Sequence, residues 1–168
     1  METQTLTEIT DLPQSNVGAP LPIVLATEYQ LILLYMVQEY DPDWDGTYTT
    51  SVGRDTKTSI VVVRFEHAGP HLFGPPNDEA LHGHPLHSLG LEAHACFEVR
   101  PSAWIAELCR RNSVHPNHTD ASYDDDRHFI FTFHDSTFEV VAHGFSWEVV
   151  SETSIGEEAA RIVAGWSG

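Results

Sequence analysis

Three histidines and three carboxylate or amide side chains fall within one stretch of fifteen residues, FGPPNDEALHGHPLH, from Phe73 to His87. His82 and His84 are one residue apart, so in an extended segment both imidazoles point to the same side and can bind one metal ion. The spacing therefore predicts a site for a divalent transition metal such as zinc, iron or manganese. The alternative is a structural role, in which these polar side chains hold a long loop together by hydrogen bonds while its prolines and glycines fix the backbone.

Serine, histidine and aspartate also occur side by side, in the stretch His134-Asp135-Ser136-Thr137. A nucleophilic triad needs a chain of hydrogen bonds in which the aspartate orients the histidine and the histidine activates the serine, and these partners normally come from separate elements. Asp135 and Ser136 are ordinary turn residues. We therefore interpret the stretch as the tip of a hairpin and not as a triad.

Four imidazole or carboxylate side chains are candidates for acid-base catalysis. His134 and Glu139 lie on the same side of the predicted hairpin, where they can exchange protons with a bound molecule if another segment covers them. Glu98 lies on the polar side of its own strand, and Asp78 belongs to the Phe73–His87 loop. The competing interpretation is a sheet face that is simply solvated.

Two further patterns look like metal sites but lack a ligand. The stretch Asp41–Gly46, DPDWDG, matches the first half of a calcium-binding EF-hand loop, yet the twelfth position is Val52 instead of glutamate and the flanking segments read as strands. We interpret it as an acidic turn. His115 and His118 follow a predicted helix, and the sequence offers no third ligand for them.

Apolar runs predict the strands that carry these residues. Glu28 to Tyr40 is apolar on both faces in its middle, so periodicity alone does not separate a central strand from a buried helix, and we favour a strand. Ile60 to Phe65 is rich in β-branched residues, and Ala93 to Arg100 alternates between apolar and polar side chains. Between them, His67 to Glu92 has no regular pattern and is longer than most loops in compact domains, which favours a function for it.

Two alternating runs, His128–His134 and Thr137–His143, predict the clearest hairpin, with Asp135 and Ser136 as its turn. This turn predicts three pairs on a core face: Phe133 with Phe138, Phe131 with Val140, and Phe129 with Ala142. The opposite face is polar and rich in histidine, and it carries His128, Ile130, Thr132, His134, Thr137, Glu139, Val141 and His143. After Gly144 the apolar positions change parity, which predicts a glycine bulge that bends the strand.

Two short helices complete the predicted architecture. Pro101 has a backbone angle suited to a first helical turn, and the helix that follows it ends near Asn112. Ser154 to Trp166 reads as an amphipathic helix whose first turn spells a capping box. We expect an α+β protein with a single domain over residues 21–168, dominated by a curled antiparallel sheet that approaches a barrel. Residues 1–20 read as a flexible lead-in.

Acidic residues outnumber basic ones by 25 to 8, which gives a formal net charge of -17 with neutral histidines. This charge opposes binding to phosphate backbones and to anionic lipid, so we expect neither nucleic acid nor a membrane as a partner. The longest strongly apolar run, Leu31 to Val37, is far shorter than the roughly 20 residues of a spanning helix. With Cys96 and Cys109 as the only cysteines and no secretory signal evident, the expected location is the cytoplasm.

Three segments, FGPPNDEALHGHPL, EVRPSAWIAELCRRNSVHPNH and RHFIFTFHDSTFEVVA, resemble a family of small uncharacterised bacterial proteins. The resemblance covers roughly Trp44 to Phe145. It implies a bacterial protein with a single domain, and it implies neither an activity nor a set of catalytic residues.

Two hypotheses for the function remain. The first is an enzyme or metal-assisted binder that acts on a small molecule between the Phe73–His87 loop and the hairpin, with His82 and His84 as metal ligands or acid-base groups and Glu139 or Glu98 as the carboxylate. The second is a non-catalytic acidic protein, of the immunity or accessory type, that covers a basic surface of a partner protein. Convergence of imidazoles and carboxylates in a concave site favours the first, which we prefer. Carboxylates clustered on one face favour the second.

Overall fold

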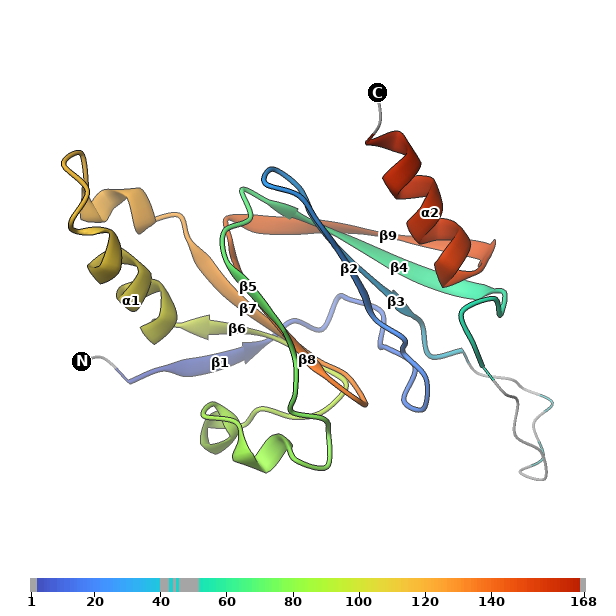
Figure 1. Ribbon diagram of the computed structural model, residues 1–168. Helices are drawn as coiled ribbons and strands as arrows, with labels where there is room; N and C mark the ends of the chain where they lie inside the picture. The colour runs from blue at the N-terminus through green and yellow to red at the C-terminus, as the bar shows by residue number, and fades with distance from the viewer. Residues whose placement is uncertain (1–2, 40–42, 44, 46–51, 167–168) are drawn as a thin grey trace.

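The computed structural model of the protein describes residues 3–39, 43, 45 and 52–166. Within these residues, nine strands and two α-helices form two antiparallel sheets, with a helix outside one sheet and an irregular segment outside the other (Figure 1). The α+β class predicted from the sequence is confirmed. The expectation that the sheet approaches a barrel is wrong, because the strands divide into two open sheets instead of closing into one.

Each sheet collects strands from distant parts of the chain. The five-stranded sheet has the order β1 (Thr5–Glu8), β6 (Cys96–Arg100), β7 (Arg127–Thr132), β8 (Thr137–Ala142) and β5 (His71–Gly74). The four-stranded sheet has the order β2 (Ile23–Ala26), β3 (Leu31–Met36), β4 (Thr58–Glu66) and β9 (Gly144–Thr153). Strands β3, β4, β6, β7 and β8 agree with the predicted strands. Strand β1 lies in the segment expected to be a flexible lead-in, and β5 lies in the segment expected to be irregular.

Aromatic and aliphatic side chains fill the space between the two sheets. Every residue of β3 is buried: Leu33 and Tyr35 pack toward the five-stranded sheet, whereas Ile32 and Leu34 pack toward α2 (Ile155–Gly165). The opposing sheet contributes the predicted core face of the hairpin, which consists of Phe129, Phe131, Phe133, Phe138, Val140 and Ala142. The prediction for this face is therefore confirmed. Burial of β3 on both faces explains why its sequence shows no alternation.

The register of the hairpin differs by two residues from the predicted register. Thr132 pairs with Thr137 at the end of the ladder. The amide N–H of Phe133 donates to the carbonyl of Ser136 at 2.8 Å, so the turn is centred on His134-Asp135. The pairs predicted from a turn at Asp135 and Ser136 are wrong for this reason. A shift of two residues leaves every side chain on its expected face, because the side-chain period of a strand is two.

The chain changes sheets between β8 and β9. It leaves the five-stranded sheet after Ala142 and enters the four-stranded sheet at Gly144. The register between β4 and β9 is continuous from the pair of Glu66 and Gly144 to the pair of Ile60 and Val150, so the bulge expected at Gly144 is not found in this described strand. The parity change in the sequence therefore reflects the move from one sheet to the other.

An irregular segment, residues 75–95, covers the outer face of the five-stranded sheet. It contains two short 3-10 helices, η1 (Leu81–Gly83) and η2 (His87–Leu89), which lie below that sheet in Figure 1. Its leucines bury against apolar residues of β6 and β7, and this cluster consists of Leu81, Leu86, Leu91, Phe97, Val99 and Ile130. The polar face of the hairpin is thus covered by the loop instead of facing solvent.

Both α-helices begin after a serine that caps the first turn. Ahead of α1 (Ala103–Asn112), the hydroxyl of Ser102 accepts the amide N–H of Ile105. Ahead of α2, the hydroxyl of Ser154 accepts the amide N–H of Glu157 at 3.2 Å, and the Glu157 carboxylate accepts the amide N–H of Ser154 at 3.1 Å. The capping box predicted for the tail is therefore confirmed.

Replacing Ser154 with alanine is expected to lower the free energy of unfolding by about 1 kcal/mol. The substitution leaves the Glu157 amide without its acceptor at the start of the helix that covers the four-stranded sheet. Urea unfolding followed by circular dichroism measures the change. Ser146→Ala, at an exposed position of β9, is the control and is expected to stay within about 0.5 kcal/mol. Equal losses for the two variants would contradict the capping role.

Two further expectations concern the membrane and the acidic turn. In the described part of the chain, no helix combines the length and apolar character that crossing a bilayer requires. The two α-helices have 10 and 11 residues. The turn interpreted over Asp41–Gly46 lies, except for Asp43 and Asp45, outside the described residues.

Candidate functional site

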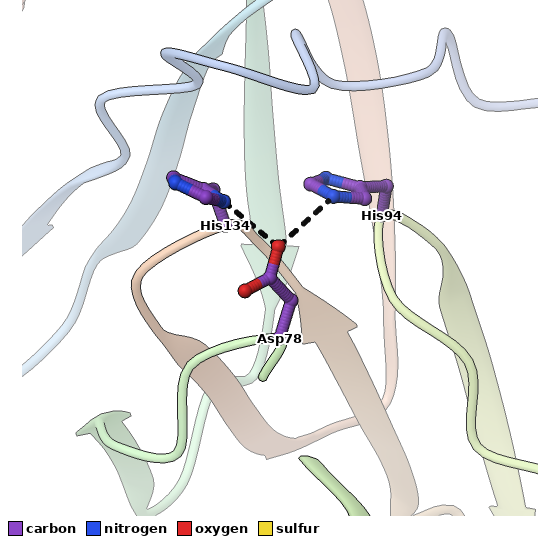
Figure 2. A group of neighbouring side chains, drawn as sticks. All are labelled: Asp78, His94 and His134. Atoms are coloured by element: carbon purple, nitrogen blue, oxygen red, sulfur yellow. Dashed lines mark hydrogen bonds and ion pairs between the residues drawn. The ribbon is translucent and has the colours of Figure 1, made fainter. Parts of the chain in front are cut away.

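The carboxylate of Asp78 lies between two imidazoles (Figure 2). Its Oδ2 atom is 2.8 Å from Nδ1 of His134 and 3.6 Å from Nε2 of His94. Asp78 and His94 lie near the two ends of the covering segment, residues 75–95, and His134 lies at the tip of the hairpin, so the group forms only in the folded chain. We call these three residues the Asp78 cluster.

Backbone contacts hold each member of the Asp78 cluster in place. The amide N–H of Asp78 donates to the carbonyl of His134 at 2.9 Å, which ties the covering segment to the hairpin tip. His94 has a φ of 58°, in the left-handed region that non-glycine residues rarely adopt. The hydroxyl of Thr132 accepts the amide N–H of Ala95 at 3.0 Å and so fixes the turn. Backbone strain of this kind concentrates at functional sites.

The contact between Asp78 and His134 shifts the pKa of both groups. The hydrogen bond from His134 lowers the pKa of Asp78, and the same bond raises the pKa of His134. Two atoms of the cluster, Oδ1 of Asp78 and Nδ1 of His94, are buried without a hydrogen-bond partner among the described residues. An unpaired buried polar group costs about 1–3 kcal/mol, so a ligand that supplies partners to this cluster would stabilise the fold.

The Asp78 cluster has the donor atoms and the spacing of a metal centre. One ligand atom from each residue lies within 4.8 Å of the other two. A tetrahedral metal bound at about 2.0–2.1 Å holds its ligand atoms about 3.3–3.4 Å apart. The separations of 2.8 and 3.6 Å from Asp78 Oδ2 lie on either side of that value. Two imidazoles and one carboxylate leave coordination positions open, as in catalytic zinc sites and non-haem iron sites.

A cavity of about 330 Å³ lies beside His94. It lies between the N-terminal segment and the adjacent ends of β6 and β7, and it is partly open to solvent. Its lining mixes apolar and polar side chains and includes Ile9, Leu12, Gln14, Tyr35, His94 and Phe133. The volume is at the lower end of the range for small-molecule pockets, about 300–1,000 Å³.

A second polar group lies on the same covered face, and we call it the Glu139 relay. Oε2 of Glu139 is 2.8 Å from Nε2 of His128, and Oε1 is 3.2 Å from Nε2 of His84. Nδ1 of His128 is in turn 3.0 Å from the hydroxyl of Ser102. Burial acts to raise the pKa of Glu139, but the hydrogen bonds from the two histidines outweigh it, and the pKa is lowered. The carboxylate is thus held ionised inside the protein.

The structure joins four of the six predicted site residues in two separate pairs. Asp78 meets His134, and His84 meets Glu139. In each pair one member comes from the covering segment and the other from the hairpin. The predicted juxtaposition of loop and hairpin therefore exists, although it forms two small groups and not one pocket.

The other two predicted site residues lie elsewhere. Glu98 faces the opposite side of the sheet from Glu139, because Phe97 and its alternate neighbours on β6 take the side under the loop. Its carboxylate binds Arg127 at 2.7 Å, and the hydrogen bond from Arg127 lowers the pKa of Glu98. His82 is exposed on η1, and neither group of metal-ligating side chains found among the described residues includes it.

Cys109, His118 and Asp120 form the second group that could hold a metal. Sγ of Cys109 is 3.8 Å from Nε2 of His118 and 3.4 Å from Oδ1 of Asp120. The sequence offers no third ligand for His118 because these partners meet only where the last turn of α1 approaches the following loop. The Asp120 side chain is 90% exposed, and burial raises the pKa of Cys109, so this group is less prepared for a metal than the Asp78 cluster.

Three residues of these two groups, His94, His128 and Ser102, were not predicted from the sequence as members of a site. His94 lies in the run Ala93–Arg100, which the sequence predicts as a strand, and its left-handed turn leaves no mark on the alternation pattern. The predicted polar face of the hairpin includes His128, so this residue could have been found from the sequence. Ser102 follows Pro101 at a helix start and is recognisable as a cap, but its contact with His128 spans 26 residues and is not visible locally.

Comparisons of the chain with protein-family models, with curated proteins and with solved structures find no match. The function is therefore inferred from the geometry of these groups.

Proposed function

We propose that the protein binds a divalent transition metal through Asp78, His94 and His134 and uses it to hold and polarise a small molecule in the adjacent cavity. One observation carries the proposal: ligand atoms of three residues that are far apart in the sequence lie within 4.8 Å of one another. Two imidazoles and one carboxylate suit zinc and iron(II) best, and manganese(II) also accepts such a set.

The same side chains can also stabilise one another without a metal. The spacing of their ligand atoms, at 2.8 and 3.6 Å from Asp78 Oδ2, is close to the spacing around a tetrahedral metal and supports metal binding. Oδ1 of Asp78 and Nδ1 of His94, which are not the atoms at these distances, are buried without a hydrogen-bond partner among the described residues.

The residues of the cluster divide the work at this centre. The metal, when bound, supplies a Lewis acid that polarises an oxygen or nitrogen atom of the small molecule. Asp78, whose lowered pKa keeps it ionised, offsets part of the metal charge. The His94 side chain is 13% exposed and lines the cavity, whereas that of His134 is 41% exposed. The molecule is expected to enter on the His94 side and to pack its apolar part against Tyr35 and Phe133.

Metal binding by the full chain, purified without a histidine tag, tests the proposal. Elemental analysis and thermal unfolding with added zinc, iron(II) or manganese(II) are the measurements. At a free metal concentration 100-fold above Kd, binding is expected to stabilise the fold by about 2.7 kcal/mol. His94→Ala is expected to abolish this stabilisation. His82→Ala removes an exposed histidine outside the cluster and is expected to retain it.

All variants carry Cys109→Ser, so that the second group of ligands does not contribute to the metal content. Less than about 0.2 metal per chain, a loose allowance for partial loss, would overturn the proposal. Equal stabilisation of His94→Ala and His82→Ala by every metal would overturn it as well.

A further inference from the structure

We propose that the Glu139 relay is a second, metal-independent site, in which Ser102 is the nucleophile of an acyl-transfer reaction, His128 is its general base and Glu139 orients the base. The substrate class is a small ester with a short apolar acyl group. The geometry carries this proposal, because a hydroxyl, an imidazole and a carboxylate from three elements form one continuous chain of hydrogen bonds. Such a chain is the functional definition of a catalytic triad, whatever the order of its members in the sequence.

The hydrogen bonds of the Glu139 relay allow the proton arrangement that a general base requires. The hydroxyl of Ser102 accepts the amide N–H of Ile105 at 3.2 Å, so its own proton is free to go to Nδ1 of His128, 3.0 Å away. The Nε2–H of His128 then donates to Oε2 of Glu139 at 2.8 Å. In this arrangement Nδ1 is the basic nitrogen of His128, and it faces the serine. This is the state that a general base needs before the reaction.

A fourth residue fixes the carboxylate. The amide N–H of Leu86 donates to Nδ1 of His84 at 3.2 Å, which leaves the Nε2–H of His84 to donate to Oε1 of Glu139, also at 3.2 Å. Both oxygens of Glu139 are thus occupied, and the carboxylate cannot turn away from His128. His84 is a positioning residue in this scheme.

Burial of His128 and Glu139 restricts access to the relay to the side of Ser102. The His128 side chain is 4% exposed and that of Glu139 is 16% exposed. The indole of Trp104 stands edge-on to the His128 ring at a centroid distance of 5.2 Å and blocks rotation of the imidazole. Ser102 is only half-buried and lines a cavity. The hydroxyl is therefore the member of the chain that meets a ligand.

The cavity beside Ser102 suits a small acyl group. Its volume is about 580 Å³, and its lining is mainly apolar. The lining residues include Gln4, Pro85, Leu89, Pro101, Ala103 and Ala106. They come from the residue before β1, from the covering segment and from the start of α1. The same segment that covers Glu139 therefore also forms one wall of the cavity.

The first turn of α1 supplies donors for a developing negative charge. The first amide groups of a helix have no partner within the helix. Ser102 accepts the amides of Ile105, through its hydroxyl, and of Ala106, through its carbonyl. Among the described residues no acceptor is found for the amide N–H groups of Ala103 and Trp104, which lie next to the nucleophile and at the positive end of the helix dipole.

The reaction proceeds in two balanced halves. Oγ of Ser102 attacks the ester carbonyl carbon while its proton moves to Nδ1 of His128. The tetrahedral intermediate then expels the alkoxy oxygen, which takes that proton and leaves as an alcohol, so that an acyl-serine remains. In the second half, water attacks the acyl carbon and gives a proton to His128, the bond to Ser102 Oγ breaks, and His128 returns the proton to that oxygen.

Labelling of the full chain with a fluorophosphonate is the first test, carried out with EDTA present so that the outcome does not depend on the metal proposal. The expected result is one adduct per chain on Ser102, located by peptide mass spectrometry, with fluoride as the leaving group. The same labelling is expected in His94→Ala. A properly folded protein that shows no adduct on Ser102 would overturn the proposal.

Hydrolysis of p-nitrophenyl acetate is the second test. Ser102→Ala is expected to lower kcat/KM by at least about 100-fold. Because Ser102 also caps α1, Ser102→Asp is the companion variant: it keeps a capping oxygen without a hydroxyl and is expected to fold and to be equally inactive. Ser122→Ala, at an exposed position of η3 (Asp120–Tyr123), is expected to retain full activity. Unchanged hydrolysis by Ser102→Asp would overturn the proposal.

The role of Glu139 has its own readout. As a residue that acts through His128, it is expected to affect kcat more than KM when replaced by glutamine. A purely structural role would instead lower the fraction of folded protein and leave the kcat of the folded fraction unchanged. Wild-type kcat in folded Glu139→Gln would overturn the assignment of Glu139 as the orienting group.

Discussion

Replacing Asp78 with alanine is expected to weaken zinc binding by about 100-fold or more. Loss of a residue that only supports a metal ligand typically costs 10–100-fold in affinity, and Asp78 is a direct ligand in the proposed centre. It is also the one anionic ligand, and it lies between the two imidazoles that complete the set. A competition titration against a chromophoric zinc chelator at neutral pH measures the change.

A neighbouring carboxylate provides the matched control for Asp78. Glu79→Ala removes an exposed carboxylate one residue further along the chain and is expected to leave the zinc affinity within about twofold of the wild type, because exposed charges interact weakly through water. Asp78→Asn keeps one oxygen donor without the charge and is expected to fall between the wild type and Asp78→Ala. Equal affinities of Asp78→Ala and Glu79→Ala would contradict the proposed ligand set.

The core of the hairpin was predictable because alternation is a local property of a sequence. In β7 and β8, phenylalanine, valine and alanine alternate with other residues from Phe129 to Phe131 and from Phe138 to Ala142, and the pleat of a strand then decides which side chains are buried. The register of the hairpin was harder to predict from the sequence. It depends on the hydrogen bond between Phe133 and Ser136, and a turn at Asp135-Ser136 has equally suitable residues. An error of two residues leaves the faces unchanged, so it did not affect the expected contents of the core.

The short edge strands were not predictable from their own residues. Strands β1 and β5 have four residues each, and most of their side chains are exposed or half-buried. They are strands because their backbones pair with β6 and β8, to which they are joined only in the folded chain. A segment of this length without a buried face carries no alternation that could reveal it.

The candidate site was predictable by segment but not by partner. The density of histidines and carboxylates in residues 73–87, opposite a polar hairpin face, indicated that the two segments meet, and Asp78 and Glu139 each found a histidine there. His94 joins them through a backbone angle held by a hydrogen bond between Thr132 and Ala95, which are 37 residues apart. No local pattern reports a contact of that range.

Replacing Glu139 with leucine is expected to lower the free energy of unfolding by about 2–6 kcal/mol at neutral pH, because two buried donors lose their acceptor at about 1–3 kcal/mol each. These donors are the Nε2–H groups of His128 and His84, whose side chains are 4% and 8% exposed. Glu139→Gln keeps one acceptor oxygen and is expected to cost about 1–2 kcal/mol. Urea unfolding followed by tryptophan fluorescence measures both variants.

Unfolding measurements at low pH distinguish the contribution of the Glu139 charge from that of its hydrogen bonds. Burial acts to raise the pKa of Glu139, and the bonds from His128 and His84 more than reverse this, so the pKa is lower in the folded chain than in the unfolded chain. Such a carboxylate contributes its stability above the unfolded pKa, about 4.3, and loses it as the pH falls through the folded value. Below about pH 4.3 the wild type is therefore expected to lose stability more steeply than Glu139→Gln.

Glu148→Gln, at a carboxylate that is 53% exposed beside Arg64, is the control and is expected to change stability by less than about 1 kcal/mol. Identical acid sensitivity of the wild type and Glu139→Gln would mean that the ionised carboxylate does not hold the two histidines in the folded protein.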